Sequence, residues 1–156
     1  AELPDSIPTF RKHVHNSAYA EGWGLYTERL SDEMGLYAAP IDRLGMLSAD
    51  SMRACRLVVD TGLHALGWSR QQAVDYLLAN SPLTEGVVRP EVDRYICSPG
   101  QATSYMVGRL EIQRMRREAE QRQGDRFDIR AFHAVVLESG SLPLDVLDAH
   151  VAAALP

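Results

Sequence analysis

The sequence predicts an all-α protein that folds as a single domain of about seven helices. Apolar residues recur at steps of three and four over most of the 156-residue chain, the period of a helix that packs on one side. No stretch of useful length alternates apolar and polar residues as a half-buried strand does. Helix caps, glycines and prolines divide the chain at short intervals, without a repeat, a low-complexity tract or an internal linker.

Composition narrows the classes of partner. The apolar content of 46% is typical of a globular protein, and the net charge of -5 predicts no nucleic-acid partner. No apolar run reaches the roughly 20 residues that cross a bilayer, so we predict no membrane span. Cys55 and Cys97 stand in apolar helical contexts and are expected to be buried thiols. The sequence shows no signal peptide, and we expect a cytoplasmic location. The sequence leaves open whether the chain forms a homo-oligomer.

Residues 1–15 are predicted to be an extended lead-in, followed by an all-helical domain over residues 16–156. Pro4 and Pro8 interrupt the lead-in, which has no clear period. His13 and His15 are two residues apart. They are either solvated loop residues or, if the segment is extended, a pair that could bind a metal.

The first long helix is predicted to begin at Asn16 or Ser17, which are good N-caps, and to end at Gly35. Gly22 and Gly24 each cost about 1 kcal/mol inside a helix, which predicts that another element packs close to the backbone there. Glu21, Leu25 and Glu28 lie near one face of this helix. A second, apolar stripe is formed by Tyr19, Trp23, Tyr26, Leu30 and Met34.

Glu21 has two interpretations. A carboxylate beside glycines on a mostly apolar helix suits a metal ligand or a general base. An acid in the first turns of a helix also stabilises the helix dipole without further function.

The second long helix is predicted from about Ser48 or Asp50 to Leu66. Its two faces separate into a core stripe and a polar stripe. The core stripe holds Met52, Cys55, Val59, Leu63 and Leu66, and the polar stripe holds Arg53, Arg56, Asp60 and His64. The polar stripe is either a solvated face with surface ion pairs or a buried stripe that lines a cleft, in which Asp60 orients His64.

Five further helices are bounded by local signals. A capping box opens the first, a proline at the first helical position opens the second, and glycines end the next two. We expect these helices at 69–80, 90–97, 101–123 and 129–139, and from 141 or 143 to the C-terminus.

Four stretches resemble, in order, the bacterial domain-of-unknown-function family eight-eight-five. They are EGWGLYTERL at 21–30, RLVVDTGLH at 56–64 with GWSR at 67–70, PGQATSY at 99–105 with Gly108, and FDIRAFH at 127–133. The resemblance runs from about residue 16 to residue 151. Members of this family look like zinc metallopeptidases of the gluzincin kind. In them a helix with a His-Glu…Pro-Gly-His pattern precedes these motifs and supplies two histidine ligands. This chain has no such pattern, so the resemblance implies the C-terminal part of a larger zincin-like protein.

The resemblance also implies roles for the two residues central to the chemistry. Glu21 becomes the third zinc ligand. Tyr105 becomes the phenol that donates a hydrogen bond to a tetrahedral intermediate, although a core tyrosine with one satisfied hydrogen bond is an equal alternative. Glu28, on the same face as Glu21, becomes an acceptor that orients a histidine ligand through its other ring nitrogen.

Five further residues are candidates for the same site, namely Arg56, Asp60, His64, Arg109 and His133. His64 and His133 are candidates for catalysis, substrate contact or support of a ligand. Arg56 and Arg109 either bind a peptide carboxylate or pair with Asp60 and Glu111.

Two functions remain open from the sequence. The first is a zinc-dependent peptidase or other amide hydrolase that acts on a peptide or small amide; this chain alone would be inactive without the upstream part of the same protein. The second is a non-catalytic helical interaction domain on a metallopeptidase-like scaffold. Zinc is an expectation from the family and does not follow from residue spacing.

Overall fold

The structure of the protein, a computed structural model, describes residue 5 and residues 7–156. These residues form eight α-helices and one 3-10 helix, and they contain no strand. The prediction of an all-α fold is therefore confirmed. The elements are α1 (Thr9–His13), α2 (Ser17–Glu33), α3 (Pro40–Ala65), α4 (Arg70–Asn80), α5 (Glu85–Cys97), α6 (Ser104–Gln123), η1 (Gly124–Arg126), α7 (Ile129–Glu138) and α8 (Leu144–Ala154).

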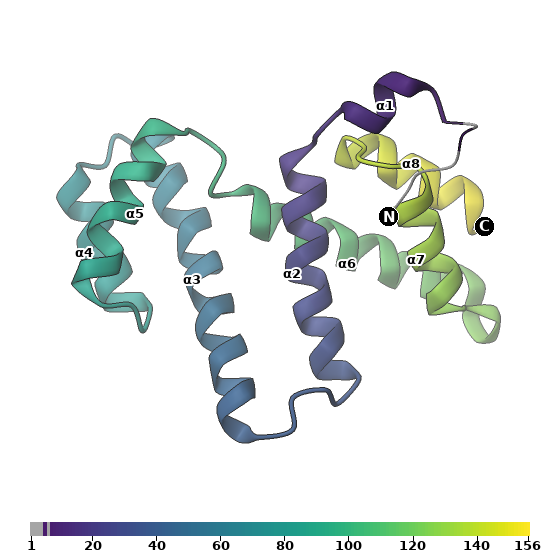
Figure 1. The fold of residues 1–156 in the computed structure, drawn as a ribbon, viewed down its shortest axis with the longest axis horizontal. Coiled ribbons are helices and arrows are strands. Elements are labelled where there is room, and N and C mark those ends of the chain that lie inside the picture. The colour runs from purple at the N-terminus through teal and green to yellow at the C-terminus, as the bar shows by residue number, and fades with distance from the viewer. Residues whose placement is uncertain (1–4, 6) are drawn as a thin grey trace.

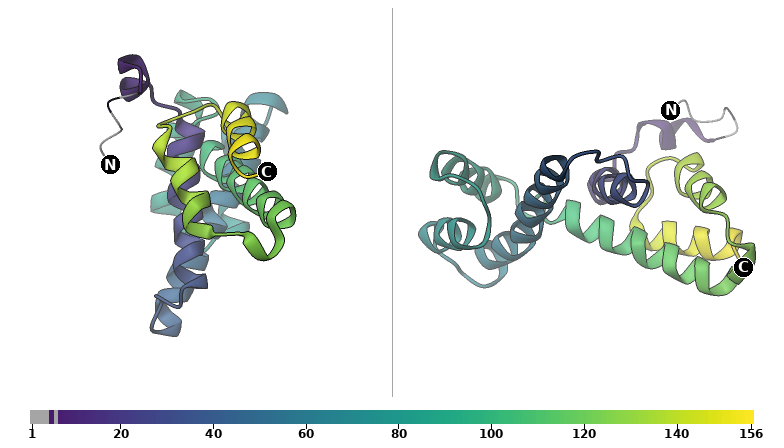
Figure 2. Two further views of the ribbon diagram at one scale, coloured as in Figure 1. Left: turned by 90° about the vertical axis from the view of Figure 1, so that its right-hand side faces the viewer. Right: turned by 90° about the horizontal axis from the view of Figure 1, so that it is seen from below.

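Helices α2 and α6 cross near the middle of the molecule, with α3, α4 and α5 to one side and α7 and α8 to the other (Figure 1). We call α3–α5 the first lobe and α2, α6, α7 and α8 the second lobe, and Figure 2 shows the two groups of helices from two further sides. Each lobe has a core of its own. The first core is built around Val59, Leu77, Val88, Val92 and Tyr95. The second is built around Tyr26, Ile112, Met115, Phe132 and Leu147.

Local caps set several helix starts as the sequence predicts. Asn16 Oδ1 accepts the Tyr19 N–H at 3.0 Å at the start of α2. Ser69 and Gln72 form the reciprocal capping box of α4, and Asp128 accepts the Arg130 N–H at the start of α7. Each bond joins residues at most three apart, which is why the sequence alone finds it.

The lead-in is helical in part. Residues Thr9–His13 form the short helix α1, so the prediction of an extended segment is wrong for them. His13 and His15 are both exposed, and a short helix does not place them on one side as an extended chain would. Pro4 lies outside the described residues.

Three other helix starts differ from the prediction. Helix α3 begins at Pro40, where Asp42 accepts the Ala39 N–H at 3.1 Å; its first ten residues are mostly exposed and show no buried stripe to reveal them. Helix α5 begins at Glu85, so Pro90 lies inside the helix and not at its first position. The earlier start places Val88 in the helix, where burial of its side chain stabilises this turn. Helix α6 begins at Ser104, after a turn.

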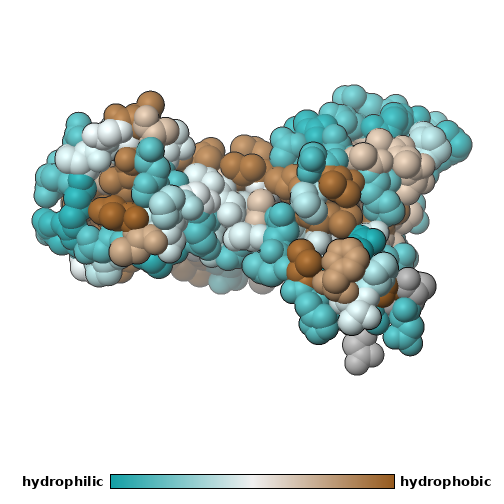
Figure 3. Space-filling view, turned by 90° about the horizontal axis from the view of Figure 1, so that it is seen from above, coloured by the Kyte–Doolittle hydropathy of each residue, from teal (hydrophilic) through white to brown (hydrophobic). Residues whose placement is uncertain are grey.

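Two predicted core positions are at the surface. Leu66 is 67% exposed because α3 has ended at Ala65. Cys97, at the last position of α5, is exposed, whereas Cys55 is buried as predicted. Figure 3 shows other apolar residues at the surface of both lobes and between them.

The crossing of α2 and α6 is a contact between two glycines. A Cβ at Gly22 would overlap the backbone of Gly108 and lie 2.9 Å from the Arg109 nitrogen. A Cβ at Gly108 would overlap the carbonyl group of Ala18. The predicted close approach to α2 is therefore confirmed at Gly22. At Gly24 it is wrong, since a Cβ there would meet nothing within 4 Å.

Candidate functional site

A small polar cavity of about 140 Å³ lies where α2, α3 and α6 meet. Three of the residues that the sequence marks as a candidate site line it together. Its lining consists of Glu21, Gly24, Leu25, Glu28, Arg53 and Tyr105.

Helix α2 supplies one wall of this cavity. Glu21, Leu25 and Glu28 line it together, as their spacing predicts. Leu25 is almost completely buried and anchors this face, whereas both acids are half-buried. Gly24 leaves the wall between the two acids free of a side chain.

Arg53 of α3 lies beside Glu28 and gives it different surroundings from those of Glu21. Its Nη2 lies 3.6 Å from Glu28 Oε1, and its side chain is 20% exposed. The Arg53 Nε is buried without a hydrogen-bond partner in the described part of the chain. Glu28 therefore already has a cation beside it, whereas no basic side chain among residues 7–156 forms an ion pair with Glu21.

Sequence reasoning placed Arg53 in a polar stripe but not in the site. It stands three residues before the matched stretch at 56–64, and its helical step from Arg56 is the only signal that points to it.

Tyr105 enters the cavity from the first turn of α6 and is half-buried. The guanidinium carbon of Arg56 lies 5.0 Å from the centre of its ring, and that of Arg53 lies 5.9 Å away. Two cations over an aromatic ring form cation–π contacts and fix its orientation. Among the described residues no hydrogen bond reaches the Tyr105 hydroxyl, which therefore differs from a core tyrosine with one satisfied bond.

Arg56 is held from behind by a buried network. Its Nε donates to the Tyr95 hydroxyl at 2.9 Å and its Nη2 to Glu91 Oε2 at 2.8 Å. Hydrogen bonds from Arg94, Tyr95 and Arg56 lower the pKa of Glu91 to about 2, and burial raises the pKa of Tyr95 to about 12. The predicted pairing of Arg56 with Asp60 does not form. Arg56 is buried and bonds to Tyr95 and Glu91, so it is not part of a solvated face with surface ion pairs.

We expect this network to make stability depend on pH. The pKa of Glu91 falls from 4.5 to about 2 on folding, so its contribution is complete above pH 4.5 and is lost as pH falls toward 2. Glu91→Gln should lower the free energy of unfolding at neutral pH, and this difference from the parent should shrink below about pH 4. Denaturant titrations at several pH values measure it. Glu85→Gln, at an exposed pair with Arg89, is the control. A Glu91→Gln deficit that does not change with pH would contradict the assignment.

Asp60 and His64 have separate partners, so the prediction that Asp60 orients His64 is wrong. The buried carboxylate of Asp60 accepts the Gly100 N–H, at 3.0 and 3.2 Å from its two oxygens. This bond fixes the turn that leads into α6 and to Tyr105. His64 is exposed, its Nε2 lies 3.0 Å from the Tyr95 carbonyl oxygen, and it does not line the cavity.

Arg109 also has a partner that the sequence does not suggest. It is buried and forms an ion pair with Asp50 of α3, whose other oxygen accepts from Arg29 of α2 at 2.7 Å. The predicted alternative partner, Glu111, pairs with Arg114 instead. Asp50 therefore joins α2, α3 and α6 beside the site.

His133 is not brought to the cavity. Its Nε2 lies 2.8 Å from the Tyr26 hydroxyl, in the second lobe, and its ring packs against Trp23 at 5.4 Å. Burial, with the nearby Arg116, lowers the pKa of His133. The lowered pKa favours the neutral imidazole, which packs in the second lobe.

Two further properties concern metals and membranes. Residues 7–156 contain no group of three or more His, Cys, Asp or Glu side chains arranged to hold a metal ion. In that same part of the chain, no helix has the length and apolar character needed to cross a bilayer.

Comparison with known proteins places the chain in a family. Residues 1–151 match the model described as "Bacterial protein of unknown function (DUF885)". No curated protein matches. A crystal structure of a "putative lipoprotein" from Colwellia psychrerythraea is 44% identical, with a TM-score of 0.91 over 94% of this chain and 25% of that one. The solved structure of a "putative lipoprotein of unknown function" from Shewanella oneidensis is 29% identical, with a TM-score of 0.86 over 93% of this chain and 27% of that one.

The chain thus spans about a quarter of the length of each of these two structures. The matched region includes every residue of the cavity. The chain belongs to the bacterial family of unknown function DUF885.

Proposed function

We propose that this chain forms one wall of the active site of a zinc-dependent amide hydrolase, within a longer protein. The observation that carries the proposal is the convergence of Glu21, Glu28 and Tyr105, from two helices, on one cavity. A helix acid that only stabilises a dipole has no need of a phenol and a second acid beside it. The site is polar and sheltered, as a site of general acid–base chemistry requires.

The residues present fit part of a metal site. Glu21 is a carboxylate without a competing ion pair among the described residues, so it is available as a ligand. Glu28 is held by Arg53 at 3.6 Å and suits the role of accepting an N–H from a histidine ligand. A catalytic zinc site takes three protein ligands, so the proposal requires two donors from another part of the longer protein.

A zinc ion bound there would polarise an amide carbonyl and activate a water molecule. The Tyr105 hydroxyl is free to donate to the oxygen that becomes negative when the carbonyl is attacked. Arg53 and Arg56, close to the Tyr105 ring, add positive charge on that side of the cavity. Leu25, which is almost completely buried, also lines the cavity.

The role of Tyr105 can be measured in the longer protein. Tyr105→Phe is expected to lower kcat for a peptide or aryl-amide substrate by about 10²–10³ with little change in KM, because only the transition state needs the hydroxyl. Tyr76→Phe, on α4 and away from the cavity, is the matched control. Unchanged turnover in Tyr105→Phe would remove the phenol from the mechanism, and the absence of bound metal in the parent would remove the hydrolase proposal.

The second candidate is a helical interaction domain without catalysis. The turn between α2 and α3 and the start of α3 expose four large apolar side chains, with exposed fractions between 60% and 69%. They are Met34, Leu36, Ile41 and Leu44. Exposed apolar patches mark interaction surfaces. A longer protein that binds no metal and hydrolyses no amide would favour this candidate.

A further inference from the structure

A second and larger cavity, of about 510 Å³, lies between α1, the loop after α7 and helix α8. It shares no residue with the cavity at Glu21. Its volume falls within the range of small-molecule sites, roughly 300–1,000 Å³. Most of its lining is apolar, formed by Phe10, Val14, Leu142, Pro143 and Val146.

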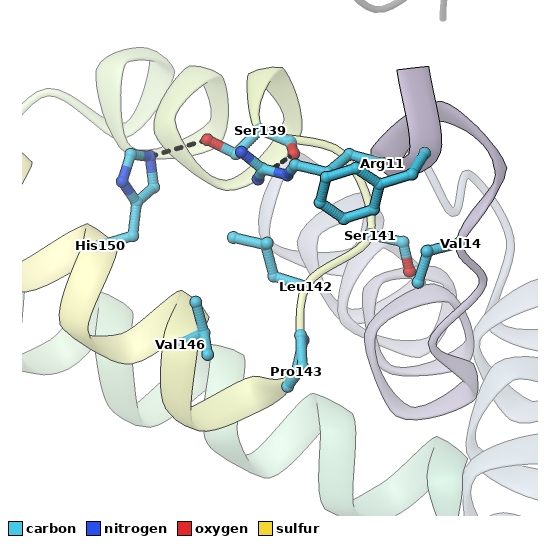
Figure 4. A pocket seen from close by; sticks show the side chains of 9 residues that line it. Arg11, Val14, Ser139, Ser141, Leu142, Pro143, Val146 and His150 are labelled. Atoms are coloured by element: carbon cyan, nitrogen blue, oxygen red, sulfur yellow. Dashed lines mark hydrogen bonds between the residues drawn. The ribbon is translucent and has the colours of Figure 1, made fainter. Parts of the chain in front are cut away.

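The polar groups of this cavity gather along one edge. Figure 4 shows Arg11, Ser139 and His150 along that edge, with Leu142 and Val146 below them. Arg11 Nη2 donates to the Ser139 carbonyl oxygen at 2.6 Å, and Ser139 Oγ lies 2.9 Å from His150 Nε2. A cation, a hydroxyl and an imidazole therefore border one side of an apolar hollow.

The edge is fixed by long-range bonds. Ser139 is the C-cap of α7, and Arg11 satisfies its carbonyl from a position 128 residues earlier in the chain. The neighbouring Ser141 Oγ accepts the Asn16 N–H at 2.8 Å, which ties the loop to the start of α2. Both walls of the cavity are thus held in place without a ligand.

The hydrogen bond to Ser139 leaves other N–H groups of Arg11 available to a ligand. A guanidinium carries five N–H groups, and the Ser139 carbonyl uses one of the Arg11 nitrogens. Among the described residues no carboxylate forms an ion pair with Arg11, although eleven other arginines have one. If His150 donates to Ser139 Oγ, the hydroxyl can in turn donate into the cavity.

We propose that this cavity binds a small amphiphilic carboxylate. The carboxylate lies on Arg11 and the Ser139 hydroxyl, and the hydrocarbon tail lies over Leu142 and Val146. Charge complementarity selects the anion, since a charge-assisted bond to a guanidinium is about twice as strong as a neutral one. The apolar floor selects the tail. This site is independent of the function proposed for the cavity at Glu21.

Isothermal titration of the 156-residue protein with octanoate tests the proposal. Octanoate is expected to bind with one-to-one stoichiometry and about tenfold or more tighter than octanol, because only the acid can use Arg11. Arg11→Gln should abolish this preference. Val146→Trp, at a position 47% exposed, should block both ligands by filling the floor without touching Arg11.

Arg130→Gln is the matched control, since Arg130 is an exposed arginine on α7 that does not line the cavity. It should bind octanoate as the parent does. Thermal melts of each variant confirm that it is folded. Equal binding of octanoate and octanol, an Arg11→Gln variant that keeps the preference, or a Val146→Trp variant that binds normally would each overturn the assignment.

Discussion

Replacing Glu21 by Gln is expected to abolish tight zinc binding and amide hydrolysis in the longer protein, while the helices of this chain stay folded. A neutral amide is a far poorer zinc ligand than a carboxylate, and two remaining ligands do not make a catalytic site. Folding should be little affected because Glu21 is half-buried and forms no ion pair among the described residues. Metal content after gel filtration and turnover of an aryl-amide are the measurements.

Glu28→Gln separates a ligand from an acid that supports one. Because Glu28 already faces Arg53, its replacement is expected to weaken metal binding or activity by about 10–100-fold and not to abolish them. Circular dichroism of both variants controls for folding. A Glu21→Gln protein that keeps one equivalent of zinc and full activity would show that Glu21 is only a helix acid, and the hydrolase proposal would fail with it.

Gly108→Ala is expected to lower the free energy of unfolding, because the site has no room for a side chain. The added Cβ would overlap the Ala18 carbonyl and lie 2.7 Å from the Gly22 Cα, and both obstacles are backbone. Helices α2 and α6 would have to move apart, and overpacking of this kind costs about 1–3 kcal/mol or more. This loss exceeds the gain of about 1 kcal/mol from the better helix propensity of alanine.

Gly45→Ala is the matched control for this prediction. It also lies within a helix, but its Cβ would meet nothing within 4 Å. Denaturant unfolding should show Gly45→Ala about 0.5–1 kcal/mol more stable than the parent and Gly108→Ala less stable. Two variants that change stability in the same direction would mean that the glycine crossing is not tight in solution.

The sequence predicts features that depend on near neighbours along the chain. Asn16, Ser69 and Asp128 cap helices through bonds that span two or three residues. The shared face of Glu21 and Glu28 follows from the helical period alone. Helix α3 begins earlier than predicted because an exposed first segment carries no buried stripe, although Pro40 and Asp42 mark its start.

The partners of buried charges could not be predicted in this way. Asp60 bonds to Gly100, forty residues along the chain, and Arg109 to Asp50, fifty-nine residues away. Each had a candidate partner nearby in its own helix, His64 four residues from Asp60 and Glu111 two residues from Arg109. Packing of α3 against the start of α6 decides between these alternatives, and a single helix pattern contains no information about that packing.

The glycine crossing of α2 and α6 has a consequence for the adaptability of the site. Glu21 and Gly22 are neighbours on α2, and Tyr105 and Gly108 are three residues apart on α6. At the crossing the two backbones touch directly, so no side-chain rotamer at that point can lengthen or shorten the span between acid and phenol. If the cavity is the active site proposed above, substrates of different size would be accommodated by Arg53 or by other parts of the longer protein, while the backbone positions of Glu21 and Tyr105 keep a constant separation.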